Sequence, residues 1–204
     1  NSNGAHCNTI PICIDDQDRS SIAVQSNAHT ITHPGTMFWP PNVAGVHWFA
    51  TEVFPKILAE VPDAKFVIMG KRPPPLIQEL PRQFPNIYVT GYIPDPTPYL
   101  EETAAFIVPL HAGAGMRVKL LDAWCWGLPI VTTTPGMEGI AARNDETLLV
   151  ADTPMAFAQA VIRLLREPEL RARLRQNGRM WVDAYYNWQN VYPNWSKIYR
   201  GLLA

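Results

Sequence analysis

The segment from residue 105 to residue 134 limits the fold of this chain more than any other stretch. It begins with the apolar run AFIVPL, which is typical of a parallel strand buried on both faces. A loop of small residues follows, and apolar residues then recur at helical spacing until Gly127, a residue type that commonly ends helices. Pro129 to Thr133 predicts the next strand. A strand, a glycine loop, a helix and a strand in this order indicate one unit of a parallel α/β sheet.

The junction between this loop and this helix carries the candidate chemistry. Gly113 and Gly115 lack a Cβ atom, so the backbone can bend sharply and approach a ligand. Arg117 and Lys119 fall at or inside the first helical turn, where basic side chains are unfavourable unless an anion joins them. Free N–H groups, two cations and glycines together predict a phosphate or diphosphate site. A solvated basic patch is the alternative.

Asp122 lies on the same helix, about one turn beyond these cations. A carboxylate there can accept hydrogen bonds from sugar hydroxyls, as the acidic residue of dinucleotide-binding folds does for a ribose. The alternative is an ordinary surface aspartate. The helix therefore combines a predicted anion site with a predicted sugar contact.

From residue 29 onward, strands and helices alternate about six times. This order predicts a Rossmann-like, doubly wound parallel sheet of about six strands, followed by C-terminal helices. Asn42 is expected to cap the first helix. Near the C terminus, aromatic residues at near-helical spacing are expected to pack a final helix, and their exposure would mark a missing partner: Tyr186, Trp188, Tyr192, Trp195 and Tyr199. The remaining predicted strands cover residues 29–33, 64–69, 86–90 and 147–150.

Composition narrows the classes of function. The 204 residues are enough for one domain with a core, and a net charge of −1 gives no general attraction for nucleic acid. Three scattered cysteines show no metal-binding or disulfide spacing, which favours a reducing, cytoplasmic compartment. No apolar run reaches the ~18 residues that span a bilayer. The Arg-rich residues 168–184 are expected to form a solvated face, with peripheral binding to a membrane surface as the alternative.

The run GAGMRVKLLDAWCWGLPIV resembles the donor-site segment of retaining GT-B glycosyltransferases of family 4, also called group 1. That family includes sucrose, mannosyl and bacterial polysaccharide transferases. The resemblance extends from about Thr9 to the C terminus. It implies that residues 1–28 are the end of a preceding domain and its linker. Residues 29–204 would then form the domain that binds the nucleotide sugar.

The resemblance also implies a set of functional residues. Arg117, Lys119 and Asp122 would act in catalysis. Other positions, mostly in loops that follow strands, would contact the donor: Gly35, Thr36, Gly70, Lys71, Arg72, Tyr92, Ile93, Gly113, Ala114, Gly115, Met116, Leu120 and Glu138. Ordinary turn glycines, loop charges, a packed tyrosine and a helix-start acid are the alternatives.

The sequence departs from the family pattern at one position. The usual pattern has two glutamates with seven residues between them, and the second falls on Asp122. The first falls on Ala114, which cannot make the sugar contact that the glutamate makes. This combination resembles a subgroup with a glycine-rich loop followed by Arg and Lys.

The resemblance implies transfer of a sugar, with retention, from a UDP or GDP sugar to a polysaccharide, a lipid or a small glycoside. It implies no divalent metal and no cofactor. The acceptor site would belong to an N-terminal domain outside this chain, so the fragment alone is expected to be inactive. A nucleotide-sugar epimerase on the same scaffold, or a non-catalytic nucleotide- or phosphate-binding module, is the alternative. The sequence motifs of nicotinamide dehydrogenases, P-loop NTPases and α/β-hydrolases do not occur.

Overall fold

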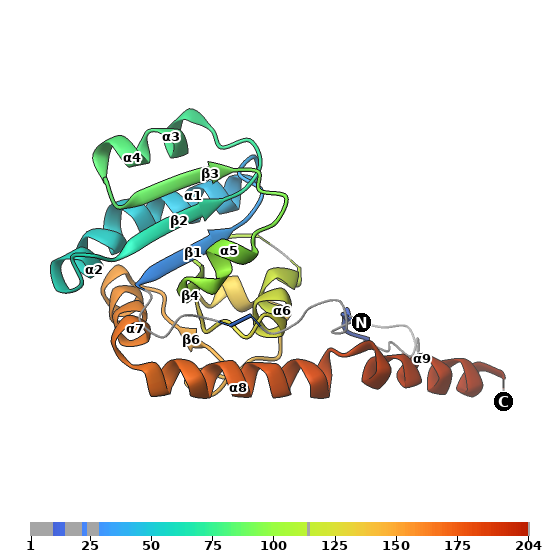
Figure 1. Cartoon of the computed structure of the whole chain (residues 1–204). Helices are drawn as coiled ribbons and strands as arrows, with labels where there is room; N and C mark the ends of the chain where they lie inside the picture. Colours follow the sequence, from blue (N-terminus) through green and yellow to red (C-terminus); the bar gives the residue numbers. More distant parts are fainter. Residues whose placement is uncertain (1–9, 15–21, 24–28, 114, 204) are drawn as a thin grey trace.

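A six-stranded parallel sheet forms the centre of the computed structural model, which describes residues 10–14, 22–23, 29–113 and 115–203 (Figure 1). The strand order is β3-β2-β1-β4-β5-β6, and every neighbouring pair is parallel. The predicted doubly wound sheet is therefore confirmed. The strands are β1 (Thr30–Pro34), β2 (Lys65–Met69), β3 (Ile87–Gly91), β4 (Thr103–Val108), β5 (Ile130–Thr132) and β6 (Leu149–Val150).

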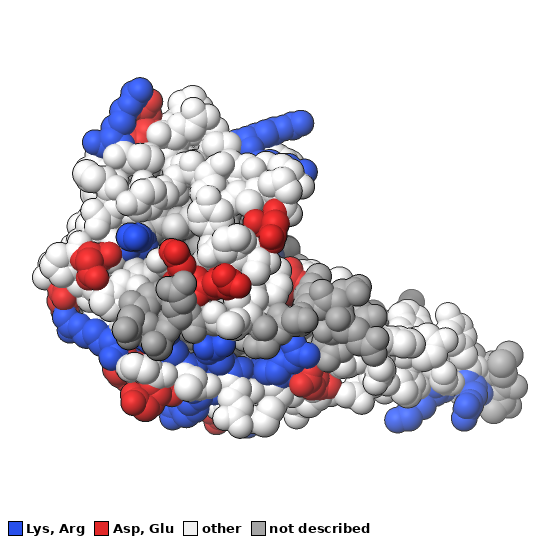
Figure 2. Space-filling model, viewed as in Figure 1, with Lys and Arg blue, Asp and Glu red and all other residues white. Residues whose placement is uncertain are grey.

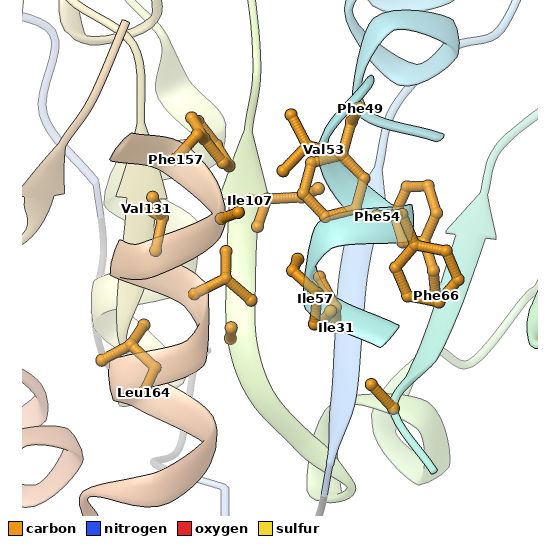
Figure 3. Packing of buried hydrophobic residues seen from close by; sticks show 14 of the residues in the cluster. Ile31, Phe49, Val53, Phe54, Ile57, Phe66, Ile107, Val131, Phe157 and Leu164 are labelled. Carbon is orange, nitrogen blue, oxygen red and sulfur yellow. The ribbon is translucent and has the colours of Figure 1, made fainter. Parts of the chain in front are cut away.

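Helices cover both faces of this sheet, as parallel strands require. On one face, Phe49 of the π-helical turn packs with Phe66 of β2 and with Phe157 of α7, and Phe54 of α2 packs with Phe66 (Figure 3). On the other face, Trp124 of α6 packs with Phe106 of β4 and Val182 of α8. The helical segments are α1 (Pro40–Trp48), a π-helical turn (Phe49–Val53), α2 (Phe54–Glu60), α3 (Pro75–Gln78), α4 (Leu80–Gln83), α5 (Thr97–Glu101), α6 (Val118–Cys125), a 3-10 turn (Pro135–Met137), α7 (Pro154–Arg166), α8 (Pro168–Tyr185) and α9 (Trp188–Leu203).

The direction of winding reverses between β1 and β4. These strands are hydrogen-bonded neighbours, although β2 and β3 lie between them in sequence. The loops after β1 and β4 therefore leave the sheet side by side, on its carboxyl edge. Ligands of doubly wound sheets bind at this point. The fold thus brings the glycine loop before α6 next to the loop that contains Gly35.

The start of α1 differs from the sequence-based prediction. Its N-cap is Trp39, which makes no side-chain capping bond, so the prediction that Asn42 caps this helix is wrong. Pro40 and Pro41 occupy the first two helical positions, where the fixed φ of proline suits a helix start. Asn42 consequently lies inside the first turn, and its amide Nδ2 donates a hydrogen bond back to the Thr36 carbonyl over 3.0 Å.

The Arg-rich helix α8 is only partly a solvated face. Figure 2 shows Lys and Arg side chains along this edge of the molecule. However, Arg171 is buried and donates to the carbonyls of Leu164 and Leu165 at the end of α7. Arg175 and Arg179 donate to backbone carbonyls as well. Arg171 and Arg179 thus satisfy carbonyls at the C-terminal ends of α7 and α6, and Arg175 ties Ile22 to α8.

The last helix, α9, extends away from the body of the domain (Figure 1). Tyr186, just before α9, is buried as expected, and its hydroxyl accepts a hydrogen bond from the Ala141 N–H. The aromatic side chains on α9 itself are exposed, so the expectation that they pack inward is wrong for Trp188, Tyr192, Trp195 and Tyr199. Within the described residues, no helix is both long enough and apolar enough to cross a membrane.

The described part of residues 1–28 is short. Ile14 forms a backbone bridge beside Asn187, and the Ile22 N–H donates to the Trp126 carbonyl. The other positions of the predicted linker lie outside the described residues. The boundary predicted at residue 29 remains a prediction.

Candidate functional site

An open cavity of about 500 Å³ lies at the point where the winding reverses. Four of the predicted site residues line it: Gly35, Thr36, Lys119 and Asp122. Its volume is in the range of ligand pockets, and its wall combines aromatic surface with a few polar groups. We call it the switch-point cavity. The complete lining is Pro34, Gly35, Thr36, Phe38, Trp39, Asn42, Lys119, Asp122 and Trp126.

Lys119 is the cation fixed most firmly in this cavity. Its Nζ donates to the Pro34 carbonyl over 3.1 Å and to Asn42 Oδ1 over 3.0 Å. The side chain thus connects α6 to the end of β1 and to α1. Burial, and then the charge of Arg117, lower the pKa of Lys119 to about 8, and Asp122 opposes the shift. An anion bound in the cavity would favour the charged form of this ammonium group.

His33 lies directly beneath this arrangement, at the end of β1, and is fully buried. Its Nδ1 is 2.9 Å from the Ile107 carbonyl, so Nδ1 carries the proton and Nε2 is an acceptor. Among the described residues, Nε2 has no hydrogen-bond partner. Burial and then the charge of Lys119 hold the pKa of His33 well below its usual range, against the effect of the Ile107 bond. The imidazole is therefore neutral at pH 7.

Arg117 has a different position from Lys119. It is the N-cap residue of α6 and is 5% exposed. Its guanidinium donates to the Gly115 carbonyl over 2.8 Å and to the Gly113 carbonyl over 2.7 Å, and it lies 5.8 Å from the centre of the Trp39 ring. Arg117 thus folds back over the glycine loop and fixes its shape. Both glycines have positive φ, 117° and 93°, which explains why glycine occupies these positions.

Gly35 and Gly70 allow the ends of β1 and β2 to touch. The Gly35 N–H donates to the Met69 carbonyl over 2.8 Å. A Cβ atom on Gly70 would lie 1.7 Å from the Gly35 carbonyl oxygen. A Cβ atom on Gly35 would lie 2.8 Å from Asn42 Nδ2 and 2.9 Å from Lys119 Nζ. Close packing of the chain therefore gives both positions a structural requirement for glycine.

The cations after β2 lie at the surface, outside the lining of the cavity. Lys71 Nζ is 4.2 Å from the centre of the Tyr92 ring, and Tyr92 itself is 62% exposed. Arg72 has a positive φ of 55°, and its guanidinium is 5.7 Å from the centre of the Phe38 ring. Because Phe38 lines the cavity, Arg72 stands at its margin. These contacts join the loops after β1, β2 and β3 through aromatic rings.

The remaining predicted contacts occupy varied positions. Leu120 is fully buried in the core, so its side chain contributes packing. Ile93 and Met116 are partly buried against the same core cluster. Glu138 is exposed just after the 3-10 turn. Ala114 lies outside the described residues.

The sequence analysis predicted Asn42 as a helix cap and not as a residue of the site. It also missed four other residues that lie in or beside the cavity: His33, Phe38, Trp39 and Trp126. One of these had a readable signal. Trp126, the C-cap of α6, follows Asp122 by four positions and Lys119 by seven, which places the three side chains on the same side of this helix. His33 and Asn42 had none, because their partners in space are remote in sequence.

The parallel sheet and the cavity at the point where its winding reverses define the class of this molecule as a Rossmann-like domain. Residues 28–167, more than half of the chain, match the family described as Glycosyl transferases group 1. The chain belongs to this family. Its fold is that of the C-terminal domain of a GT-B glycosyltransferase, as the sequence resemblance implied.

Similar proteins agree with this assignment. An uncharacterized 44.6 kDa protein in the cps region of Klebsiella pneumoniae is 33% identical over 136 residues, which are 63% of this chain and 35% of that protein. Two solved structures share the fold. The C-terminal domain of the group 1 family protein LpcC from Francisella tularensis has a TM-score of 0.71 and 18% identity, covering 85% of this chain and 98% of that one. A TarM variant from S. aureus, in complex with UDP, has a TM-score of 0.76 and 14% identity, covering 96% and 40%.

The chain spans about a third of the length of the Klebsiella relative. Among the described residues, no group of three His, Cys, Asp or Glu side chains is arranged to hold a metal ion.

Proposed function

We propose that this chain is the donor-binding domain of a glycosyltransferase that transfers a sugar, with retention, from a nucleotide-diphosphate sugar to an acceptor. One observation carries the proposal: the Lys119 ammonium lies at the start of α6, in the switch-point cavity, with Asp122 one turn away. Two of its three N–H groups are held by Pro34 and Asn42, which leaves one for a ligand. The family match supports sugar transfer as the reaction.

The chemistry required of this domain is electrostatic. When the bond between the sugar and the diphosphate breaks, negative charge grows on the leaving phosphate oxygen. Lys119 is held in place before the reaction by its hydrogen bonds, and together with the first N–H groups of α6 it would stabilise this charge. Arg117 fixes the glycine loop and adds positive potential from behind it. Asp122 accepts hydrogen bonds from the ribose hydroxyls of the donor.

These cations supply the charge compensation that a divalent metal supplies in other transferases. We therefore propose that the reaction needs no metal. We propose that the acceptor site and the closure of the cleft belong to a second domain; the Klebsiella relative, of which this chain spans about a third, is long enough to hold one. Closure over the donor excludes water and brings the acceptor to the sugar.

The proposal is tested by calorimetric titration of this chain with UDP, GDP, ADP and the matching nucleosides. UDP comes first because the similar TarM structure contains it. We expect at least one diphosphate to bind, and Lys119→Met to weaken that binding about 10- to 150-fold, the equivalent of losing a hydrogen bond to a charged group. Nucleoside binding should change little.

The matched control is Lys56→Met. Lys56 is an exposed lysine on α2, so its replacement removes the same charge from the chain without touching the cavity. Equal losses in both variants would mean that net charge, and not the position of Lys119, determines affinity. Failure of every diphosphate to bind the wild-type chain would contradict the proposal.

A further inference from the structure

Asn42 is an uncharged residue that is 3% exposed, lines the switch-point cavity and connects three parts of the site. Its backbone belongs to the first turn of α1, its Nδ2 donates to the Thr36 carbonyl after β1, and its Oδ1 accepts from Lys119 Nζ on α6. Both ends of the amide are thus occupied. A buried amide satisfied in this way has one orientation, because a flipped amide would leave both contacts mismatched.

The two acceptors that hold Lys119 are both neutral, since one is a backbone carbonyl and the other is this amide oxygen. A neutral acceptor orients an ammonium group without cancelling its charge. An aspartate in the same position would form an ion pair and compensate the charge that an incoming anion requires. The amide of Asn42 therefore fixes the direction of the Lys119 ammonium group and leaves its charge uncompensated.

Of the four described side chains that face Lys119 from the surrounding elements, one carries a negative charge. From β1 comes His33, which is neutral and whose Nε2 can only accept. From α6 itself come Arg117, which repels the ammonium, and Asp122, whose attraction is the weakest of the influences on it. From α1 comes Asn42. An ammonium group in such surroundings loses its proton easily, so each hydrogen bond that favours the charged form matters.

We propose that Asn42 is a positioning residue: its amide oxygen aims the Lys119 ammonium into the switch-point cavity and keeps it charged without neutralising it. The inference rests on the proposed function because the ligand that requires this charge is a diphosphate. Its test is independent of that function, because the charge state of Lys119 can be measured without any ligand.

The test is NMR titration of the Lys119 side chain in the wild-type chain, in Asn42→Leu and in Asn42→Asp, with Lys119→Met to assign the signal. In wild type, the pKa should lie near 8. Loss of the acceptor in Asn42→Leu should lower this pKa, and the carboxylate in Asn42→Asp should raise it by at least one unit. If Asn42 merely packs the start of α1, both variants lose thermal stability while the titration of Lys119 stays unchanged, and that result would overturn the proposal.

Diphosphate binding gives the second readout. Affinity should fall about tenfold per pH unit above the pKa of Lys119, and the fall should begin at higher pH in Asn42→Asp. Lys119→Arg is the control, because a guanidinium group does not titrate in this range. The affinity of this variant should not change with pH, and any change that remains would come from ionisation of the diphosphate itself. Asn42→Asp should also bind more weakly than wild type at pH 7, since its carboxylate competes with the diphosphate. Absence of diphosphate binding to wild type would refute the proposed function, while the ligand-free titration would still decide the role of Asn42.

Discussion

The N-terminal end of α6 and the loop after β2 each carry two basic residues at the same edge of the sheet, but the structure holds them differently. Arg117 and Lys119 are bonded to backbone carbonyls and to Asn42, inside the domain. Lys71 and Arg72 are exposed and stand over aromatic rings. A cation fixed by hydrogen bonds can act at one place, whereas an exposed cation on a flexible stem raises the local potential without a fixed direction.

The largest difference between the two regions should appear when an arginine is removed from each. Arg117→Ala deletes two charge-assisted bonds to the glycine loop, so we expect the free energy of unfolding to fall by about 1.5–3 kcal/mol. Arg72→Ala should change it by less than about 0.5 kcal/mol, as for other surface substitutions. Urea unfolding of both variants measures the contrast. Equal values would show that the loop before α6 does not depend on Arg117.

The second largest difference is expected at alkaline pH, between the effects of Lys119 and Lys71 on stability. Because the pKa of Lys119 is about 8 in the folded state and near 10.4 in an unfolded chain, the unfolded state binds more protons between these values. Stability conferred through this group therefore rises as pH increases from 8 toward 10, by up to about 1.4 kcal/mol per unit. Urea unfolding at pH 7.5 and 9.5 should show this gain in wild type and in Lys71→Met, and a smaller gain in Lys119→Met. The same gain in all three proteins would contradict it.

A smaller and more selective effect is expected from Asp122. If its carboxylate accepts from a ribose, Asp122→Asn should weaken UDP binding by about 0.5–1.5 kcal/mol and leave pyrophosphate binding unchanged. Calorimetry with both ligands distinguishes this from an electrostatic role. A parallel loss for UDP and pyrophosphate would mean that Asp122 acts on Lys119 or Arg117.

The smallest expected effect is that of a chelator. If fixed cations compensate the diphosphate, the complete protein should keep its transferase activity in EDTA. A sugar-release assay with and without EDTA makes the comparison, and a matching assay of residues 1–204 should show no transfer to an acceptor. Loss of activity in EDTA, restored by Mg²⁺, would mean that a metal ion, and not the cations at the start of α6, compensates the charge of the diphosphate.

The parts of this structure that follow from local pattern were predictable, and those that depend on distant contacts were not. The buried strands and the helix with Lys119 follow from hydrophobic periodicity, and the glycines before α6 follow from the φ angles that such a loop needs. Strand ends differ from the predictions by one or two residues because pairing with neighbours sets them.

Asn42 shows why the rest was hidden. Its residue type and place in the chain favour a helix cap, but two prolines already start the helix, and its amide bonds a lysine 77 positions away. Lys119 likewise reaches Pro34 across 85 positions. The sequence places a cation at the helix start, but only the folded chain shows what fixes its direction and lowers its pKa.

The aromatic wall of the switch-point cavity has an optical consequence. The chain has seven tryptophans, and two of them, Trp39 and Trp126, line the cavity. Trp124 lies in the core with its indole N–H bonded to the Thr147 carbonyl, out of reach of solvent. A small quencher such as iodide therefore has access to Trp39 and Trp126, and also to the exposed Trp188 and Trp195 of α9, but not to Trp124. The part of the quenching that a ligand suppresses can thus report occupancy of the site in the unlabelled protein, while the shielded indole of Trp124 provides an internal reference for the integrity of the fold.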